Sequence, residues 1–143
     1  MEISRDLSSD ERTKLLQMAR EALKSAYAPY SRFRVGAAVL TEKDNIFSGC
    51  NVENASYGLT ICAERAAICS AVANEGGNNM KIRAICVVND QDSTCSPCGA
   101  CRQVIYEFGP NAIVIFRGHE GLVTAQATEL LPDGFVAYVK SSS

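Results

Sequence analysis

Two short cysteine clusters constrain this chain more than any other feature. Cys62 begins the sequence Cys-Ala-Glu-Arg, and Cys98 and Cys101 lie in Pro-Cys-Gly-Ala-Cys. The residues between the clusters are enough for one helix and one strand, so a fold could bring three thiolates and the Glu64 carboxylate to one point. Three thiolates suit a tetrahedral Zn²⁺ and leave its fourth position open for water, as in a catalytic zinc site.

The residues beside the cysteines suggest how such a zinc would be used. Glu64 follows a ligand by two positions and would close the site if it were a fourth ligand. We therefore expect it to act as the general acid/base, which takes a proton from water and returns it to a ring nitrogen and a departing amine. Three thiolates leave the zinc site with net negative charge. Arg65 and Arg102 are the candidates to donate hydrogen bonds to the sulfurs and restore the metal's acidity.

Local signals predict alternating helices and strands. Ser8 and Glu11 form a capping box, and apolar residues at helical spacing follow until Pro29. Further segments are a strand at 35–41 in a hairpin with 46–52, a helix from 62 to Gly76, a strand at 81–88, a helix at 98–108, and strands at 112–116 and 122–125. This order predicts a single α/β domain over residues 1–143, with a mixed five-stranded sheet in a three-layer α/β/α arrangement.

The predicted helices place the metal clusters favourably. Both clusters fall at helix N-termini, where unpaired N–H groups and the helix dipole favour thiolate over thiol. Ligands of open α/β sheets also bind where helix N-termini face the crevice beyond the strand ends. The position of the motifs and the predicted architecture therefore agree.

Composition excludes several classes of partner. The 143 residues carry a formal net charge of -2, with acidic and basic residues interspersed. The sequence therefore predicts no basic surface for a nucleic acid polymer or an anionic membrane. A small neutral ligand is favoured instead. Residues 1–12 lack a signal pattern, and no apolar run approaches the roughly 20 residues of a membrane span, so we expect a cytoplasmic protein. The seven cysteines then indicate metal binding and reduced thiols.

The whole pattern resembles a known family. A Cys or His two residues before Glu, followed by Pro-Cys-x-x-Cys, occurs in zinc deaminases that act on cytosine and adenine. Beyond these motifs, the chain is similar over nearly its whole length to the homotetrameric cytidine deaminases of the all-cysteine zinc class. The similarity is carried by residues 30–37, 51–57, 101–103 and 129–132.

The resemblance implies a hydrolase of pyrimidine salvage, acting on the C–N bond of a cyclic amidine. It would convert cytidine and 2′-deoxycytidine to uridine and 2′-deoxyuridine with release of ammonia. The family's pattern implies one Zn²⁺ per subunit, held by Cys62, Cys98 and Cys101, and self-association as a homotetramer. It further implies that Phe33 stacks on the pyrimidine and that Asn51 and Glu53 hold the ribose. A neighbouring subunit's site would be closed by Ala55, Tyr57 and Phe135. Arg65 would neutralise the thiolates.

Other interpretations of the same features remain open at this point. A deaminase for a nucleoside-like antibiotic such as blasticidin S shares the zinc motifs, although residues 51–54 favour the cytidine branch. A non-catalytic, zinc-stabilised interaction domain is a second alternative. The presence of Glu64 and of only three evident ligands argues against it. Asn51 and Glu53 could merely order their loop, and Phe33 alone would more often be a core residue.

The remaining cysteines and the histidine have simpler interpretations. Cys95 makes a Cys-x-x-Cys-x-x-Cys run with Cys98 and Cys101, which suggests an iron–sulfur cluster, but no fourth cysteine follows at the usual spacing. Three others lie in apolar segments and are predicted to pack as small hydrophobic residues: Cys50, Cys69 and Cys86. His119 is predicted to be a solvated loop residue.

Overall fold

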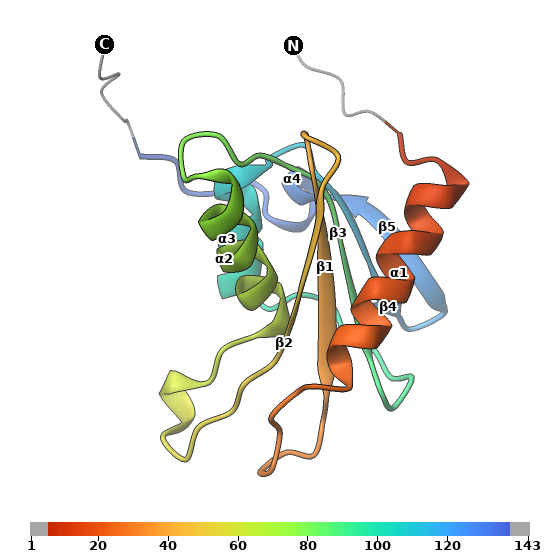
Figure 1. Ribbon diagram of the computed structural model, residues 1–143, viewed down its shortest axis with the longest axis vertical. Coiled ribbons are helices and arrows are strands. Elements are labelled where there is room, and N and C mark those ends of the chain that lie inside the picture. Colours follow the sequence, from red (N-terminus) through yellow and green to blue (C-terminus); the bar gives the residue numbers. More distant parts are fainter. Residues whose placement is uncertain (1–5, 138–143) are drawn as a thin grey trace.

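The computed structural model describes residues 6–137, in which a five-stranded sheet lies between helices on its two faces (Figure 1). The spatial order of the strands is β2-β1-β3-β4-β5. The strands are β1 (Val35–Thr41), β2 (Ile46–Cys50), β3 (Ile82–Asn89), β4 (Ile113–Gly118) and β5 (Gly121–Gln126). The helices are α1 (Ser9–Leu23), the short 3-10 turn η1 (Tyr57–Leu59), α2 (Ala63–Glu75), α3 (Gly99–Phe108) and α4 (Ala127–Leu130). None of the helices in the described part of the chain is long and apolar enough to cross a membrane.

Helix α1 begins as predicted and ends earlier than predicted. The Ser8 hydroxyl accepts a hydrogen bond from the Glu11 N–H, and the Glu11 carboxylate accepts one from the Ser8 N–H, which completes the capping box. The helix stops at Leu23, well before Pro29. The chain leaves the helix because the Tyr27 N–H is instead paired with the Asn51 carbonyl, at 3.0 Å.

The mixed sheet confirms the predicted fold class. β1 is antiparallel to both β2 and β3, β3 is parallel to β4, and β5 is antiparallel to β4. The predicted hairpin of the first two strands is therefore present. Helix α2 after it connects two parallel strands of the sheet, β2 and β3, which are not neighbours because β1 lies between them. The short helix α4 and the turn η1 were not predicted.

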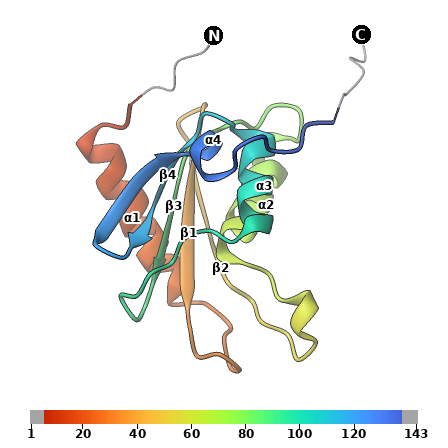
Figure 2. The ribbon, with the colours of Figure 1, turned by 180° about the vertical axis from the view of Figure 1, so that it is seen from behind.

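The core has two halves, one on each face of the sheet. In β1, Ala38 and Leu40 pack with Leu15 and Ala19 of α1, whereas Ala37 and Val39 belong to the cluster that includes α2 and α3. β1 is buried on both faces, which explains why its sequence is continuously apolar rather than alternating. The second view shows α2 and α3 together on the face opposite α1 (Figure 2).

Strand direction brings the two cysteine clusters together. β2 and β3 are each antiparallel to β1 and therefore run the same way. Helix α2 follows β2 in the chain, and α3 follows β3. Both helices consequently begin beyond the carboxyl ends of strands at one edge of the sheet, the usual place for a ligand in an open α/β fold.

Gly49 in β2 controls how closely α2 approaches the sheet. A Cβ added to Gly49 would lie 2.4 Å from the backbone nitrogen of Ala67. We expect Gly49→Ala to push α2 outward, with an overpacking cost of about 1–3 kcal/mol and a lower melting temperature. Because Cys62 and Glu64 lie at the start of α2, zinc retention should fall as well. Gly77→Ala, whose nearest contact would be 4.0 Å, is the matched control. Equal melting temperatures for the two variants would contradict this account.

Candidate metal centre and catalytic site

Three cysteine sulfurs meet where α2 and α3 begin. Cys62 is the N-cap of α2, Cys98 is the N-cap of α3, and Cys101 lies in the first turn of α3. Their Sγ atoms all lie within 4.8 Å of one another. With Zn–S bonds of about 2.3 Å, tetrahedral geometry needs sulfurs about 3.8 Å apart, so small side-chain adjustments would suffice. The donor set therefore fits a zinc ion with three thiolate ligands.

Arg65 lies against this cluster and favours its ionisation. Its Nη2 donates to the Cys62 Sγ at 3.3 Å. A hydrogen bond from the Cys101 thiol, together with the hydrogen bond and charge of Arg65, lowers the pKa of Cys62 to about 5. The pKa of Cys101 is raised, because its proton is shared in a hydrogen bond with the Cys62 sulfur and its side chain is buried. A bound cation would take the place of that shared proton, so zinc binding should release protons.

Arg102 has a different role from the one predicted. Its Nε donates to the Pro97 carbonyl at 2.7 Å, and its Nη1 donates to the Leu130 carbonyl at 2.9 Å. The guanidinium therefore braces the backbone before Cys98 instead of bonding to a sulfur. The Cys101 N–H, at 3.4 Å, is the group that donates to the Cys98 Sγ.

Glu64 is the buried acid of the site. Its side chain lies in the first turn of α2 and is only 5% exposed. Burial raises the pKa of Glu64, and the negative charge of the nearby Cys62 thiolate raises it further. A carboxyl group with a raised pKa can hold a proton closer to neutral pH and release it again, which is what a general acid/base requires.

Asn51 and Glu53 tie their own segment to the loop that carries Phe33. The Asn51 Oδ1 accepts from the Val35 N–H at 2.9 Å, and its Nδ2 donates to the Phe33 carbonyl at 2.8 Å. Glu53 accepts from the Ser31 hydroxyl and from the N–H groups of residues 30 and 31, at 3.0 and 3.1 Å. The Ser31 hydroxyl also contributes most to lowering the pKa of Glu53. Both side chains thus order the loop around the half-buried Phe33, and their contact with ribose stays a prediction.

The three residues that are predicted to close a neighbouring subunit's site are exposed on the surface of this subunit. The side chain of Tyr57 is 89% exposed and that of Phe135 is 72% exposed, and Ala55 is exposed as well. Gln103 was not singled out from the sequence, although it lies in the matched segment 101–103. It hydrogen-bonds to the backbone of Phe135.

The remaining cysteines lie outside the cluster of three. Cys95 is half-buried, and burial raises its pKa to about 11, so it stays a thiol at neutral pH. Cys86 is fully buried and contacts the Leu15 carbonyl at 3.2 Å, as expected for a packed residue. Cys69 is exposed on α2, so the prediction that it packs in the core is wrong. His119 is exposed in the turn between β4 and β5, as predicted.

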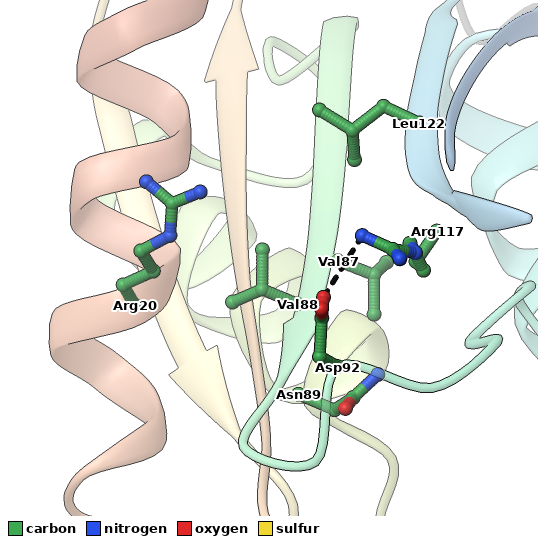
Figure 3. A pocket seen from close by; sticks show the side chains of 7 residues that line it. All are labelled: Arg20, Val87, Val88, Asn89, Asp92, Arg117 and Leu122. Atoms are coloured by element: carbon green, nitrogen blue, oxygen red, sulfur yellow. Dashed lines mark ion pairs between the residues drawn. The ribbon is translucent and has the colours of Figure 1, made fainter.

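A hollow of about 150 Å³ lies at the carboxyl ends of β3 and β4 (Figure 3). An ion pair of 2.9 Å between Arg117 and Asp92 lies in its wall. The other residues that line it are Arg20, Val87, Val88, Asn89 and Leu122. It shares no lining residue with the cysteine cluster or Glu64, so it is separate from the metal centre.

The ligand set can be tested by removing one sulfur at a time. We expect Cys98→Ala to lose most of its zinc, because two thiolates and a water bind the ion far more weakly than three thiolates. Cys69→Ala is the matched control, since it removes an exposed thiol outside the cluster. Metal analysis of each purified protein, with circular dichroism to verify folding, gives the zinc content per chain. Full zinc occupancy in Cys98→Ala would overturn the assignment.

Comparisons with known proteins agree with this geometry. The family model for the "Cytidine and deoxycytidylate deaminase zinc-binding region" matches residues 9–117. Cytidine deaminase from Mycobacterium tuberculosis is 43% identical over 117 residues, 82% of this chain and 84% of that protein. The corresponding protein from Halalkalibacterium halodurans is 44% identical over 129 residues, 89% of this chain and 96% of that protein.

Solved structures give the same result for the fold. The crystal structure of cytidine deaminase from Burkholderia pseudomallei has a TM-score of 0.76 to this chain at 44% identity. The match covers 90% of this chain and 100% of that one. The structure from Mycobacterium tuberculosis has a TM-score of 0.77 at 37% identity, with 92% and 100% covered. This chain therefore belongs to the cytidine and deoxycytidylate deaminase family, with a zinc-binding region built on three cysteines.

Proposed function

We propose that this protein hydrolyses cytidine and 2′-deoxycytidine to uridine and 2′-deoxyuridine, with release of ammonia. The observation that carries the proposal is a buried glutamate, Glu64, beside three sulfurs that can hold one zinc ion. A structural zinc site would need a fourth ligand and no acid. The relatives named cytidine deaminase, at 43–44% identity, support the choice of cytidine. We assign the whole chain, residues 1–143, to one catalytic domain.

Glu64 performs the proton transfers of this reaction. When bound by Cys62, Cys98 and Cys101, zinc supplies the acidity that makes water a nucleophile near neutral pH. The water oxygen adds to C4 of the cytosine ring, and the bond from C4 to the exocyclic amino nitrogen breaks. Glu64 accepts a proton from the water oxygen and delivers it to N3, and it then carries a proton to the departing amino nitrogen. Water and cytidine thus become uridine and ammonia.

Three residues in the segments just before β1 and just after β2 select a nucleoside. We assign the pyrimidine face to Phe33 and the ribose hydroxyls to Asn51 and Glu53. The lowered pKa of Glu53 keeps it a carboxylate, which is an acceptor with lone pairs left for a hydroxyl. A site that holds the 3′-hydroxyl favours free nucleosides over polymers, in keeping with the net charge of -2. Pyrimidine salvage in the cytoplasm is the corresponding role, since thiolate ligands need a reducing compartment.

We further propose that the active form is a homotetramer with one zinc per subunit. Backbone bridges join Tyr27 to Val52 and Val52 to Ile61, and all three side chains are substantially exposed. Leu59 and Tyr57 extend this apolar surface, at 63% and 89% exposure. A cluster of exposed apolar side chains of this kind favours a protein interface. Ala55, Tyr57 and Phe135 would then reach a neighbouring subunit's substrate.

The role of Glu64 is tested by Glu64→Gln. The amide keeps the size of the side chain but cannot transfer protons, so turnover of cytidine should fall by about 10²–10⁴-fold or more. Zinc content and melting temperature should stay close to those of the wild-type protein. Ammonia release and the ultraviolet change from cytidine to uridine measure the rate. Turnover within tenfold of the wild type in a zinc-loaded variant would refute the assignment.

The assembly is tested by sedimentation of the wild-type protein and of Leu59→Asp. A charge placed on the proposed interface should lower the average mass toward dimers or monomers, because burying it unpaired is costly. The affinity for cytidine should weaken together with assembly, while zinc remains bound. A fully active wild-type monomer would refute subunit-shared sites.

A further inference from the structure

The segment after α4 is fastened to α3 through one side chain. The Gln103 Nε2 donates to the Phe135 carbonyl at 2.9 Å, and the Phe135 N–H donates to the Gln103 Oε1 at 3.2 Å. A single amide therefore satisfies both backbone groups of Phe135, much as a neighbouring strand would. This pair of bonds fixes where the Phe135 backbone lies relative to α3.

The neighbouring residue is seated on the same face of the helix. A Cβ added to Gly134 would lie 3.0 Å from ring carbons of Tyr106. Tyr106 follows Gln103 by three positions, so both side chains lie on one face of α3. The segment is thus pressed against the helix at Gly134 and hydrogen-bonded to it at Phe135.

The side chain of Phe135 is exposed, whereas its backbone is hydrogen-bonded to Gln103. Phe135 is 72% exposed, although burial of its ring within the chain would stabilise the fold. The chain therefore anchors the backbone of this residue and presents the ring outward. Such an arrangement suits a ring that docks into another molecule.

The anchor is built on the helix that carries two metal ligands. Cys98 and Cys101 lie at the start of α3, and Gln103 lies two residues further on. Arg102, between them, bonds to the carbonyls of Pro97 and Leu130 and so braces the ligand turn against the end of α4. The backbone of Phe135 is consequently held at a fixed position relative to the metal centre of its own subunit.

We infer that Gln103 is a positioning residue, which sets the Phe135 ring for the substrate site of a neighbouring subunit. This inference rests on the proposed function, in which Phe135 closes that site. Gln103 does not touch the reacting atoms, so it governs substrate binding and leaves the chemical step and the zinc unaffected.

The test compares two substitutions of Gln103. Gln103→Met keeps the length of the side chain and removes both hydrogen bonds, whereas Gln103→Glu keeps the acceptor for the Phe135 N–H. For Gln103→Met we expect the KM for cytidine to rise about tenfold, the effect of losing two hydrogen bonds, with kcat and zinc content within twofold of the wild type. Gln103→Glu should rescue part of the loss. Glu107→Ala, at an exposed position on the same helix, is the control and should match the wild type.

Hydrogen exchange supplies a readout at the anchor itself. The Phe135 amide should exchange faster in Gln103→Met, while amides in the interior of α3 keep their protection. An unchanged KM for Gln103→Met would overturn the inference, and so would equal losses of kcat and zinc, which would indicate general destabilisation. If the zinc-loaded wild-type protein releases no ammonia from cytidine, the proposed function itself fails. The two failures are therefore distinguishable.

Mixed assemblies test whether the ring acts on a neighbour. Gln103→Met subunits keep Glu64, and Glu64→Gln subunits keep a properly held Phe135. Assemblies re-formed from an equal mixture should contain active sites that combine the two intact parts, so the KM should return toward the wild-type value. A KM that stays at the Gln103→Met value would overturn the placement of Phe135 in a neighbouring site.

Discussion

The site depends on holding three cysteine sulfurs within 4.8 Å of one another, an arrangement that the negative charges of their thiolates oppose. The proton that the Cys101 thiol shares with the Cys62 sulfur in a hydrogen bond lowers the pKa of Cys62 and raises that of Cys101. Arg65 stabilises the negative charge on Cys62, and the helix N-termini supply partial positive charge. The same arrangement is suited to bind zinc, whose positive charge replaces the shared proton. Burial raises the pKa of Glu64, and the negative charge of the nearby Cys62 thiolate raises it further.

The rest of the fold maintains that juxtaposition. β1 lies between β2 and β3 and is antiparallel to both, so β2 and β3 run in the same direction. Helices α2 and α3, which follow them, therefore begin at one edge of the sheet. Gly49 lets α2 lie close to β2, and Arg102 braces the turn before Cys98. The loops that hold Phe33 are in turn ordered by Asn51 and Glu53. In the proposed function, chemistry and substrate selection therefore depend on separate parts of the chain.

Features with a local cause could be predicted from the sequence. The capping box at Ser8 and the helix starts at both cysteine clusters depend on residues a few positions apart. The insertion of β1 between β2 and β3 depends on pairings between distant residues, which no local pattern records. The early end of α1 has the same origin, since Tyr27 pairs with Asn51.

The site shows the same division. Arg65 lies three residues after Cys62 on α2, so its contact with the sulfur follows from helical spacing. Arg102 is also next to a ligand, but one of its two partners, the Leu130 carbonyl, comes from a distant part of the chain. The exposure of Cys69 escaped prediction because α2 is rich in alanine and has no sharply apolar face.

The central claim, that three cysteines and Glu64 form a zinc-dependent cytidine deaminase, is tested most directly by titrating metal into metal-free protein. Ammonia release from cytidine should be absent before zinc is added, rise in proportion to it, and level off at about one zinc per chain. Turnover by the metal-free protein, or a fully zinc-loaded protein that releases no ammonia, would contradict the account.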